Sequence, residues 1–325
     1  PSRYFCVMHY SLASLFPMNI PTTRLGLRPR PFIWVLLLGC ILAYPLAPAV
    51  SSPSGDKRDY ILVINTYAES TPWSRGIITD ITARVEQIEN LELYTEHINL
   101  LLVDSPREIE TFETNLLREY GKKPPRALVL IGTPTALLRN FINSIWKGIP
   151  TIVCAEQDFV GPDKYYQKRL PIPASEQVPL RTLADRDNLT LLYSPAYLDQ
   201  SIDLMKRILP GMDRLIFIDD ARYVNRQTEH DLAELLDSKY GGIKYTVYSA
   251  DEIGIDQLLD SLSTVDVKRT GVLFSSWHYL KNMSGRNEIM TNPFKIIASS
   301  SVPLFSLRPT GLKSSGMIGG CVFDE

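Results

Sequence analysis

The chain has 325 residues, with 34 Lys and Arg against 36 Asp and Glu and a formal net charge of -2. A charge this close to zero provides no positive field for nucleic acid, so we expect no nucleic-acid partner. The hydrophobic share of 45% suffices for a folded core and excludes disorder along the whole chain. The length favours two globular units after an N-terminal segment.

An apolar stretch at residues 31–46 follows three arginines and precedes Ala-Pro-Ala. This order is typical of a secretory signal, and we expect translation to start at Met18, with residues 1–17 upstream of it and unfolded. Two alternatives stay open: the stretch remains as a membrane anchor, or Cys40, which follows Leu-Leu-Gly, is lipidated. In all three cases the rest of the chain is exported to the periplasm or to the periplasmic face of the membrane.

The first unit, residues 59–187, begins after a polar linker that ends at residue 58. Its compact apolar runs predict buried strands, and its runs with apolar residues at helical spacing predict helices. Alternating strands and helices indicate a parallel sheet wrapped by helices on both faces. Strands are expected near residues 60–66, 91–98, 127–131 and 151–155, and helices near residues 74–88, 106–120 and 135–145.

The same alternation returns in a second unit, residues 188–325, after a loop at residues 157–187. Two short apolar segments, 188–193 and 316–323, are predicted to cross between the units and form a hinge. Because the chain ends just after the second crossing, we expect a C-terminally truncated protein. Strands are expected near residues 214–218, 244–248, 271–275 and 302–306, and helices near residues 195–209, 226–239, 256–263 and 288–299.

The cysteines and histidines predict no metal site. Cys154 and Cys321 lie in separate apolar runs and are expected to be buried free thiols. No cluster of Cys and His has metal-ligand spacing, and neither GxGxxG nor GxxxxGK[ST] occurs, so we expect no cofactor. HExxH and GxSxG are also absent, and we expect no catalytic residue in this chain.

Candidate ligand-binding residues are found by topology. Ligands of parallel α/β sheets bind beyond the carboxyl ends of the strands, which places six loops at the site. The aromatic residues there are suited to stacking on a ring of the ligand, and the arginines are suited to binding an anion. The threonines are suited to capping a helix or to binding a ligand. The candidates are Tyr67, Trp73, Arg75, Thr133, Thr135, Glu156, Asp219, Arg222, Tyr223, Ser276, Trp277 and Arg308. Each aromatic has a structural alternative, which is to cap the core of its own unit.

Several segments resemble the type I periplasmic binding proteins, in the branch of ABC-transporter substrate-binding proteins that also occurs as sensor domains of membrane histidine kinases. Residues 61–76 carry the first strand into a Tyr and a Pro-Trp, and residues 149–153 hold an Ile-Pro before an apolar strand. Further likeness lies at residues 209–214, 302–306 and 316–324. The resemblance implies two doubly wound parallel-sheet lobes joined by a hinge.

The resemblance also implies a function. We expect an extracytoplasmic sensor domain, the input part of a two-component histidine kinase, that binds a small molecule and signals by lobe closure. The alternative is a solute-binding protein or lipoprotein of an ABC transporter, and an α/β enzyme is a distant third. The expected ligand is anionic or ring-containing. A homodimer, and attachment to the membrane through the N-terminal segment or a later span, are further expectations.

Overall fold

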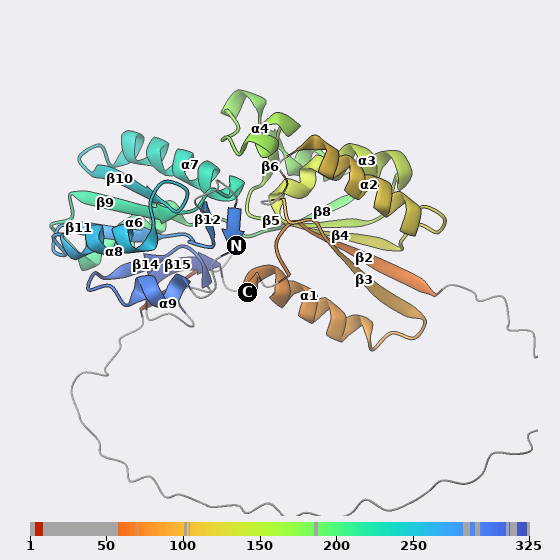
Figure 1. Cartoon of the computed structure of the whole chain (residues 1–325), viewed down its shortest axis with the longest axis horizontal. Coiled ribbons are helices and arrows are strands. Elements are labelled where there is room, and N and C mark those ends of the chain that lie inside the picture. The colour runs from red at the N-terminus through yellow and green to blue at the C-terminus, as the bar shows by residue number, and fades with distance from the viewer. Residues whose placement is uncertain are drawn as a thin grey trace, which may run out of the picture. The chain divides into compact units, whose positions relative to one another are not determined.

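The computed structural model describes residues 4–8, 58–69, 71–100, 103, 105–184, 188–281, 287–289, 293–309, 312 and 317–323. The predicted leader, including Cys40 and Met18, lies outside these residues. Within them, the chain forms two separate parallel sheets with helices on both faces of each, which confirms the predicted α/β class (Figure 1).

The first sheet has the strand order β3-β2-β4-β5-β8, and all of its strand pairs are parallel. Its interior strand β2 carries side chains to both faces because successive residues of a strand point in opposite directions. Leu62 and Ile64 pack toward α2 and α3, whereas Val63 packs toward α1. Figure 1 shows α1 on one side of this sheet and α2 and α3 on the other. The elements are β2 (Asp59–Asn65), α1 (Pro72–Val85), β3 (Leu91–His97), α2 (Pro106–Tyr120), β4 (Ala127–Ile131), the 3₁₀ helix η1 (Thr133–Leu138), α3 (Arg139–Ile145), β5 (Thr151–Ala155) and β8 (Leu189–Tyr193).

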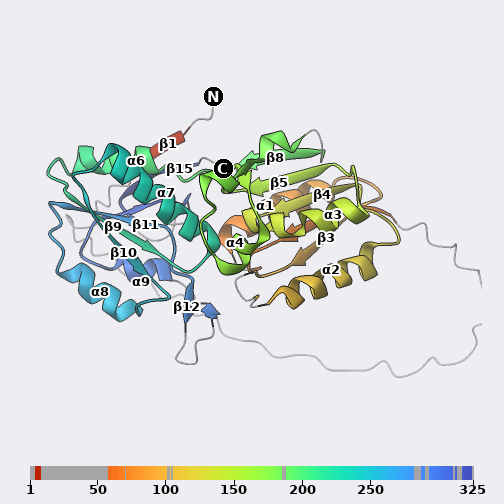
Figure 2. The same ribbon diagram turned by 90° about the horizontal axis from the view of Figure 1, so that it is seen from above.

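The second sheet has the order β10-β9-β11-β14-β15, all parallel, with β1 added antiparallel beside β15. Leu215 and Phe217 of β9 pack with α6 and α7, and Ile216 and Ile218 pack with α8 and α9. Figure 2 shows these two helix pairs on opposite sides of the sheet. The elements are β1 (Tyr4–Met8), α6 (Leu198–Ile208), β9 (Arg214–Asp219), α7 (Tyr223–Lys239), β10 (Lys244–Ser249), α8 (Ile255–Ser263), β11 (Thr270–Phe274), α9 (Pro293–Ala298), β14 (Leu304–Ser306) and β15 (Gly319–Phe323).

One prediction about segments is corrected, and the two predicted crossings stay predictions. Both crossings contain strands that belong to a sheet: β8 pairs with β5 in the first sheet, and β15 pairs with β14 in the second. The helix predicted at residues 288–299 begins only at Pro293, because residues 287–289 form β13 (Asn287–Ile289), which pairs with β12 (Tyr279–Lys281). Proline is favoured in the first turn of a helix and sets this start.

Two expectations about the N-terminus and the cysteines also change. Residues 1–17 were expected to remain unfolded, yet β1 pairs with β15. Cys321 is in a disulfide, so it is not the free thiol that the sequence predicted. Cys154 is a buried free thiol, as predicted, and burial raises its pKa to about 11.

The loop between β5 and β8 folds into a small insertion of short elements. Its strands pair antiparallel, and Ile172 within it is fully buried. The Ile172 N–H donates a hydrogen bond of 2.8 Å to Oε1 of Gln227, which lies on α7 of the second sheet. The elements of the insertion are β6 (Phe159–Val160), α4 (Asp163–Lys168), η2 (Ala174–Glu176), β7 (Val178–Pro179) and η3 (Leu180–Thr182).

Candidate functional site

One pocket is lined by residues that follow strands of both sheets. Parallel strands end at a common edge, so the loops after β2, β5, β9, β11 and β14 are brought close to it. We call this the polar pocket. It is lined by Tyr67, Thr71, Pro72, Trp73, Glu156, Ser194, Pro195, Arg222, Val224, Ser275, Ser276, His278, Leu307, Arg308 and Pro309.

Glu156 is the centre of the part of the polar pocket that comes from the first sheet. The Tyr67 hydroxyl donates a hydrogen bond to Oε1 of Glu156. The backbone N–H and the hydroxyl of Thr133 both donate to Oε2, each at 3.2 Å. Burial, together with the nearby Glu156 carboxylate, raises the pKa of Tyr67 well above its usual value, so its hydroxyl keeps the donated proton. Both oxygens of Glu156 are therefore engaged.

Gly132 makes this arrangement possible. Its φ of 99° lies in the region that favours glycine. A Cβ at this position would lie against Oγ1 of Thr66 and 2.9 Å from Cε2 of Tyr67. The glycine thus lets the turn after β4 pass beside Tyr67 and present the Thr133 N–H to Glu156.

On the side of the second sheet, Asp220 holds residues that line the polar pocket, although Asp220 itself does not line it. This fully buried carboxylate accepts hydrogen bonds from the Arg222 side chain at 2.8 Å, Asn225 at 2.6 Å, Ser276 at 3.0 Å and the His278 N–H at 2.8 Å. Burial alone would raise the pKa of Asp220, but the Arg222 guanidinium and the hydrogen bonds bring it below the usual value. Asp220 is therefore ionised and joins the loop after β9 to the loop after β11.

Arg308 differs from Arg222 in having no ionic partner in the part of the chain that the structure describes. Among the described residues its guanidinium makes no hydrogen bond and no ion pair, although Glu156, Tyr67 and Arg222 are near enough to influence its pKa. Burial lowers that pKa, but arginine remains protonated in proteins. Its backbone is fixed by Ser306, whose hydroxyl donates to the Arg308 carbonyl at 2.8 Å and accepts from the Arg308 N–H at 3.2 Å.

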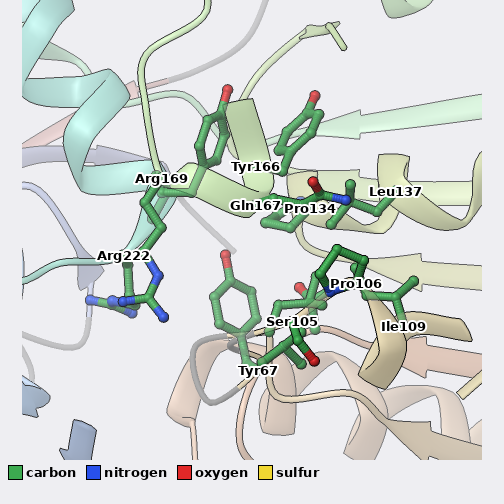
Figure 3. A pocket seen from close by; sticks show the side chains of 15 residues that line it. Tyr67, Ser105, Pro106, Ile109, Pro134, Leu137, Tyr166, Gln167, Arg169 and Arg222 are labelled. Atoms are coloured by element: carbon green, nitrogen blue, oxygen red, sulfur yellow. The ribbon is translucent and has the colours of Figure 1, made fainter. Parts of the chain in front are cut away.

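A second pocket, which we call the apolar pocket, shares Tyr67, Arg222 and Val224 with the polar pocket. Figure 3 shows its side chains, with Arg169 and Arg222 at one end and Leu137 and Ile109 at the other. It is lined by Thr66, Tyr67, Leu100, Val103, Ser105, Pro106, Ile109, Pro134, Leu137, Tyr166, Gln167, Arg169, Arg222, Tyr223 and Val224.

Most of the predicted site residues come together at these pockets. The polar pocket is lined by the predicted Tyr67, Trp73, Glu156, Arg222, Ser276 and Arg308. Tyr223 lines the apolar pocket, where its ring lies 4.7 Å from the ring of Tyr166. Thr133 and Thr135 lie behind Glu156 and line neither pocket. Thr135 is buried, and its hydroxyl donates to the Gly132 carbonyl at 2.7 Å.

Three predicted site residues lie elsewhere. Arg75 is exposed on α1 and lines neither pocket. Trp277 is fully buried in the core between the second sheet and α8, which is the structural alternative weighed for each aromatic. Asp219 is also fully buried, with Nη1 of Arg226 3.9 Å from its carboxylate, and burial raises the pKa of Asp219 to about 8.

Asp220, Asn225, Tyr166 and Arg169 were not predicted at the site. Asp220 stands next to Asp219 in a loop where no periodicity tells which carboxylate faces which way. Asn225 lies in the first turn of α7, and its amide also donates to Ser276 at 2.7 Å. Tyr166 and Arg169 belong to the insertion, whose elements are too short to leave a pattern.

Two further observations concern the described residues alone. They contain no group of three or more His, Cys, Asp or Glu placed to hold a metal ion. None of their helices has both the length and the apolar character needed to span a membrane.

No protein family and no curated protein matches the sequence. Solved structures that are similar include a conserved domain protein from Vibrio cholerae O1 biovar El Tor, at 15% identity and a TM-score of 0.47, over 79% of this chain and 76% of that one. Another is an ABC domain from Streptococcus pneumonia in complex with L-Trp, at 12% identity and a TM-score of 0.48, over 78% and 75%. A third is a carbohydrate transporter solute binding protein from Agrobacterium radiobacter in complex with D-arabinose, at 12% identity and a TM-score of 0.46, over 78% and 76%.

Substrate-binding proteins and a ligand-binding receptor recur among the similar structures. The fold itself is established by this chain's own strands. Each of its two sheets has parallel strands in a doubly wound order, with helices on both faces.

Proposed function

We propose that this chain is an exported small-molecule-binding domain whose ligand occupies the polar pocket. The observation that carries the proposal is that the pocket draws its side chains from the strand ends of both sheets. A ligand there contacts Tyr67 and Glu156 from one sheet and Arg222, Ser276 and Arg308 from the other. Binding can therefore favour one arrangement of the two sheets, which is the physical requirement for a ligand-driven switch.

The ligand carries an anionic group. The Arg308 guanidinium has five N–H donors and no hydrogen-bond partner among the described residues. An unpaired guanidinium in a partly buried site is stabilised by an acceptor that can take two of its hydrogen bonds, as a carboxylate or a phosphate does. Arg222 lines the same pocket and keeps its Nε bonded to Asp220.

We infer further that the domain is the input part of a membrane sensor kinase. Support comes from the Pro-Trp that follows the first strand in the resembling sensor domains, since Trp73 of this chain lines the polar pocket. The alternative is the solute-binding component of an importer. Membrane attachment and a homodimer remain predictions that accompany both.

Native mass spectrometry of the full chain, purified without denaturation, tests ligand binding. We expect the wild type to retain a small molecule. In Arg308→Gln the fraction of protein that carries this molecule should fall by about tenfold or more, whereas in Arg75→Gln it should stay as in the wild type. Arg75 is a matched control because it is exposed and outside both pockets. Equal retention by Arg308→Gln would remove the basis of the proposal.

Deletion of the gene distinguishes a sensor from an importer component. If the protein is a sensor, the deletion abolishes the transcriptional response to the identified ligand and leaves uptake of that ligand unchanged. Loss of uptake of the labelled ligand would instead favour the importer.

A further inference from the structure

The apolar pocket continues the polar pocket. Tyr67, Arg222 and Val224 line both pockets. A ligand in either pocket therefore touches residues that also line the other pocket. The two therefore act as parts of a single binding region with different chemistry at each end.

Charge and apolar surface are separated within this region. Figure 3 shows the guanidinium groups of Arg169 and Arg222 gathered at one end of the apolar pocket, while Leu137 and Ile109 lie at the opposite end. Leu137 and Ile109 are buried members of the first sheet's core, so the apolar end is backed by packed side chains. A ligand that fills the region needs an anionic end and an apolar end.

The hydrogen-bond donors and acceptors of the region limit the ligand further. Glu156 is the only carboxylate among the described residues that line the two pockets, and its oxygens already accept hydrogen bonds from Tyr67 and Thr133. The Asp220 carboxylate is likewise occupied by its own partners. Donors remain available on Arg308, whereas the one carboxylate among the described lining residues already accepts three hydrogen bonds, which leaves it little capacity for an ammonium group of a ligand.

We infer that the ligand is an apolar organic acid without an ammonium group. Its carboxylate is bound by Arg222 and Arg308, and its apolar body extends past Tyr67 into the apolar pocket. This inference rests on the proposed function and adds the chemical class of the ligand. A sugar fits less well because its hydroxyl groups would meet the apolar end without hydrogen-bond partners.

Calorimetric titration of the full chain with two series of probes tests the inference. In the first series, propanoate, butanoate, pentanoate and hexanoate, we expect affinity to rise by roughly fourfold for each methylene group. The second is a matched pair, 3-phenylpropanoate and phenylalanine, which differ by the ammonium group. We expect 3-phenylpropanoate to bind at least about tenfold more tightly, because an ammonium group without a partner loses its hydration.

A variant that fills the apolar pocket separates the two parts of the region. Val103 is partly buried, lines the apolar pocket and does not line the polar pocket. In Val103→Trp we expect the gain with chain length to disappear, so that hexanoate binds no more tightly than propanoate. Val178→Trp, at an exposed position outside both pockets, is expected to keep the gain.

The possible outcomes distinguish this inference from the proposed function. Affinity that is independent of chain length, or tighter binding of phenylalanine, would overturn the organic-acid assignment. If the retained ligand is then polar and its retention still depends on Arg308, the proposed function stands without the inference. If retention does not depend on Arg308, both are overturned.

Discussion

The Ser276 hydroxyl donates a hydrogen bond of 3.0 Å to Oδ2 of Asp220, and this bond joins the loop after β11 to the loop after β9. Both residues are almost fully buried, and only Ser276 lines the polar pocket. Asp220 therefore positions the pocket residues without lining the pocket itself.

Replacing Asp220 is expected to destabilise the protein strongly. In Asp220→Ala the Arg222 guanidinium loses its carboxylate, and Asn225, Ser276 and the His278 N–H lose an acceptor. Breaking a buried ion pair costs about 3 to 5 kcal/mol of unfolding free energy, measured by urea titration. Asp80→Ala removes an exposed carboxylate of α1 and is expected to change stability by less than about 0.5 kcal/mol. A similar small effect at both positions would show that the network adds no stability.

Asp219 predicts a specific pH dependence of stability. Burial raises its pKa to about 8, above the value of about 3.9 in an unfolded chain, so the folded state binds the proton more tightly. Its contribution is thus full below about pH 4 and is lost as the pH rises toward 8 and above. Asp219→Asn removes the titration. At pH 9 we expect this variant to unfold at a higher temperature than the wild type, with a free energy of unfolding that is greater by an amount on the order of 3 kcal/mol. The two proteins should be alike at pH 5, and parallel stability curves from pH 5 to 9 would refute the assignment.

Gly132 and Gly148 form a matched pair for testing the turn beside Tyr67. Both have positive φ, but a Cβ at Gly148 would meet open space, whereas one at Gly132 meets Thr66 and Tyr67. We expect Gly148→Ala to cost roughly 1 to 2 kcal/mol from its backbone alone and Gly132→Ala at least about 2 kcal/mol more. Gly132→Ala should also weaken binding of the retained ligand. Equal unfolding midpoints for the two variants would mean that the turn tolerates the contact.

Gln227 is expected to control the exchange of a single amide. Its Oε1 accepts from the Ile172 N–H at 2.8 Å, and its Nε2 donates to Asp231 at 2.8 Å. In Gln227→Ala the Ile172 amide keeps its buried position without an acceptor, at a cost of about 1 to 3 kcal/mol. Hydrogen exchange followed by mass spectrometry should show faster exchange in the peptides that contain Ile172. Gln87→Ala, at an exposed position after α1, should leave the same peptides unchanged.

The parallel sheets could be predicted because their strands are unbroken apolar runs. β2, β4, β9 and β11 are buried on both faces, and such runs are distinguishable from their surroundings. β8 was not predicted as a strand because it lies at the sheet edge, where Leu192 is 55% exposed, and a short half-exposed apolar run resembles a linker. The insertion escaped prediction because its short elements have no period.

The loops of the site could be predicted from topology, but the orientation of each side chain within a loop could not. Ser276 and Trp277 are consecutive, yet the first lines the polar pocket and the second packs in the core. Outside a strand or helix no period assigns alternate residues to opposite sides. Whether the predicted residues bind a ligand therefore remains a prediction, to be decided by the variants above.

The hydrogen bonds of Glu156 and Asp220 have a consequence for affinity. Immobilising a side chain on binding costs about 0.5 to 1.5 kcal/mol for each flexible residue. Tyr67, Thr133, Asn225 and Ser276 are already held in place by the two carboxylates when the chain has folded. A ligand that enters the polar pocket thus loses less conformational entropy from the protein, and more of its contact energy remains as binding free energy.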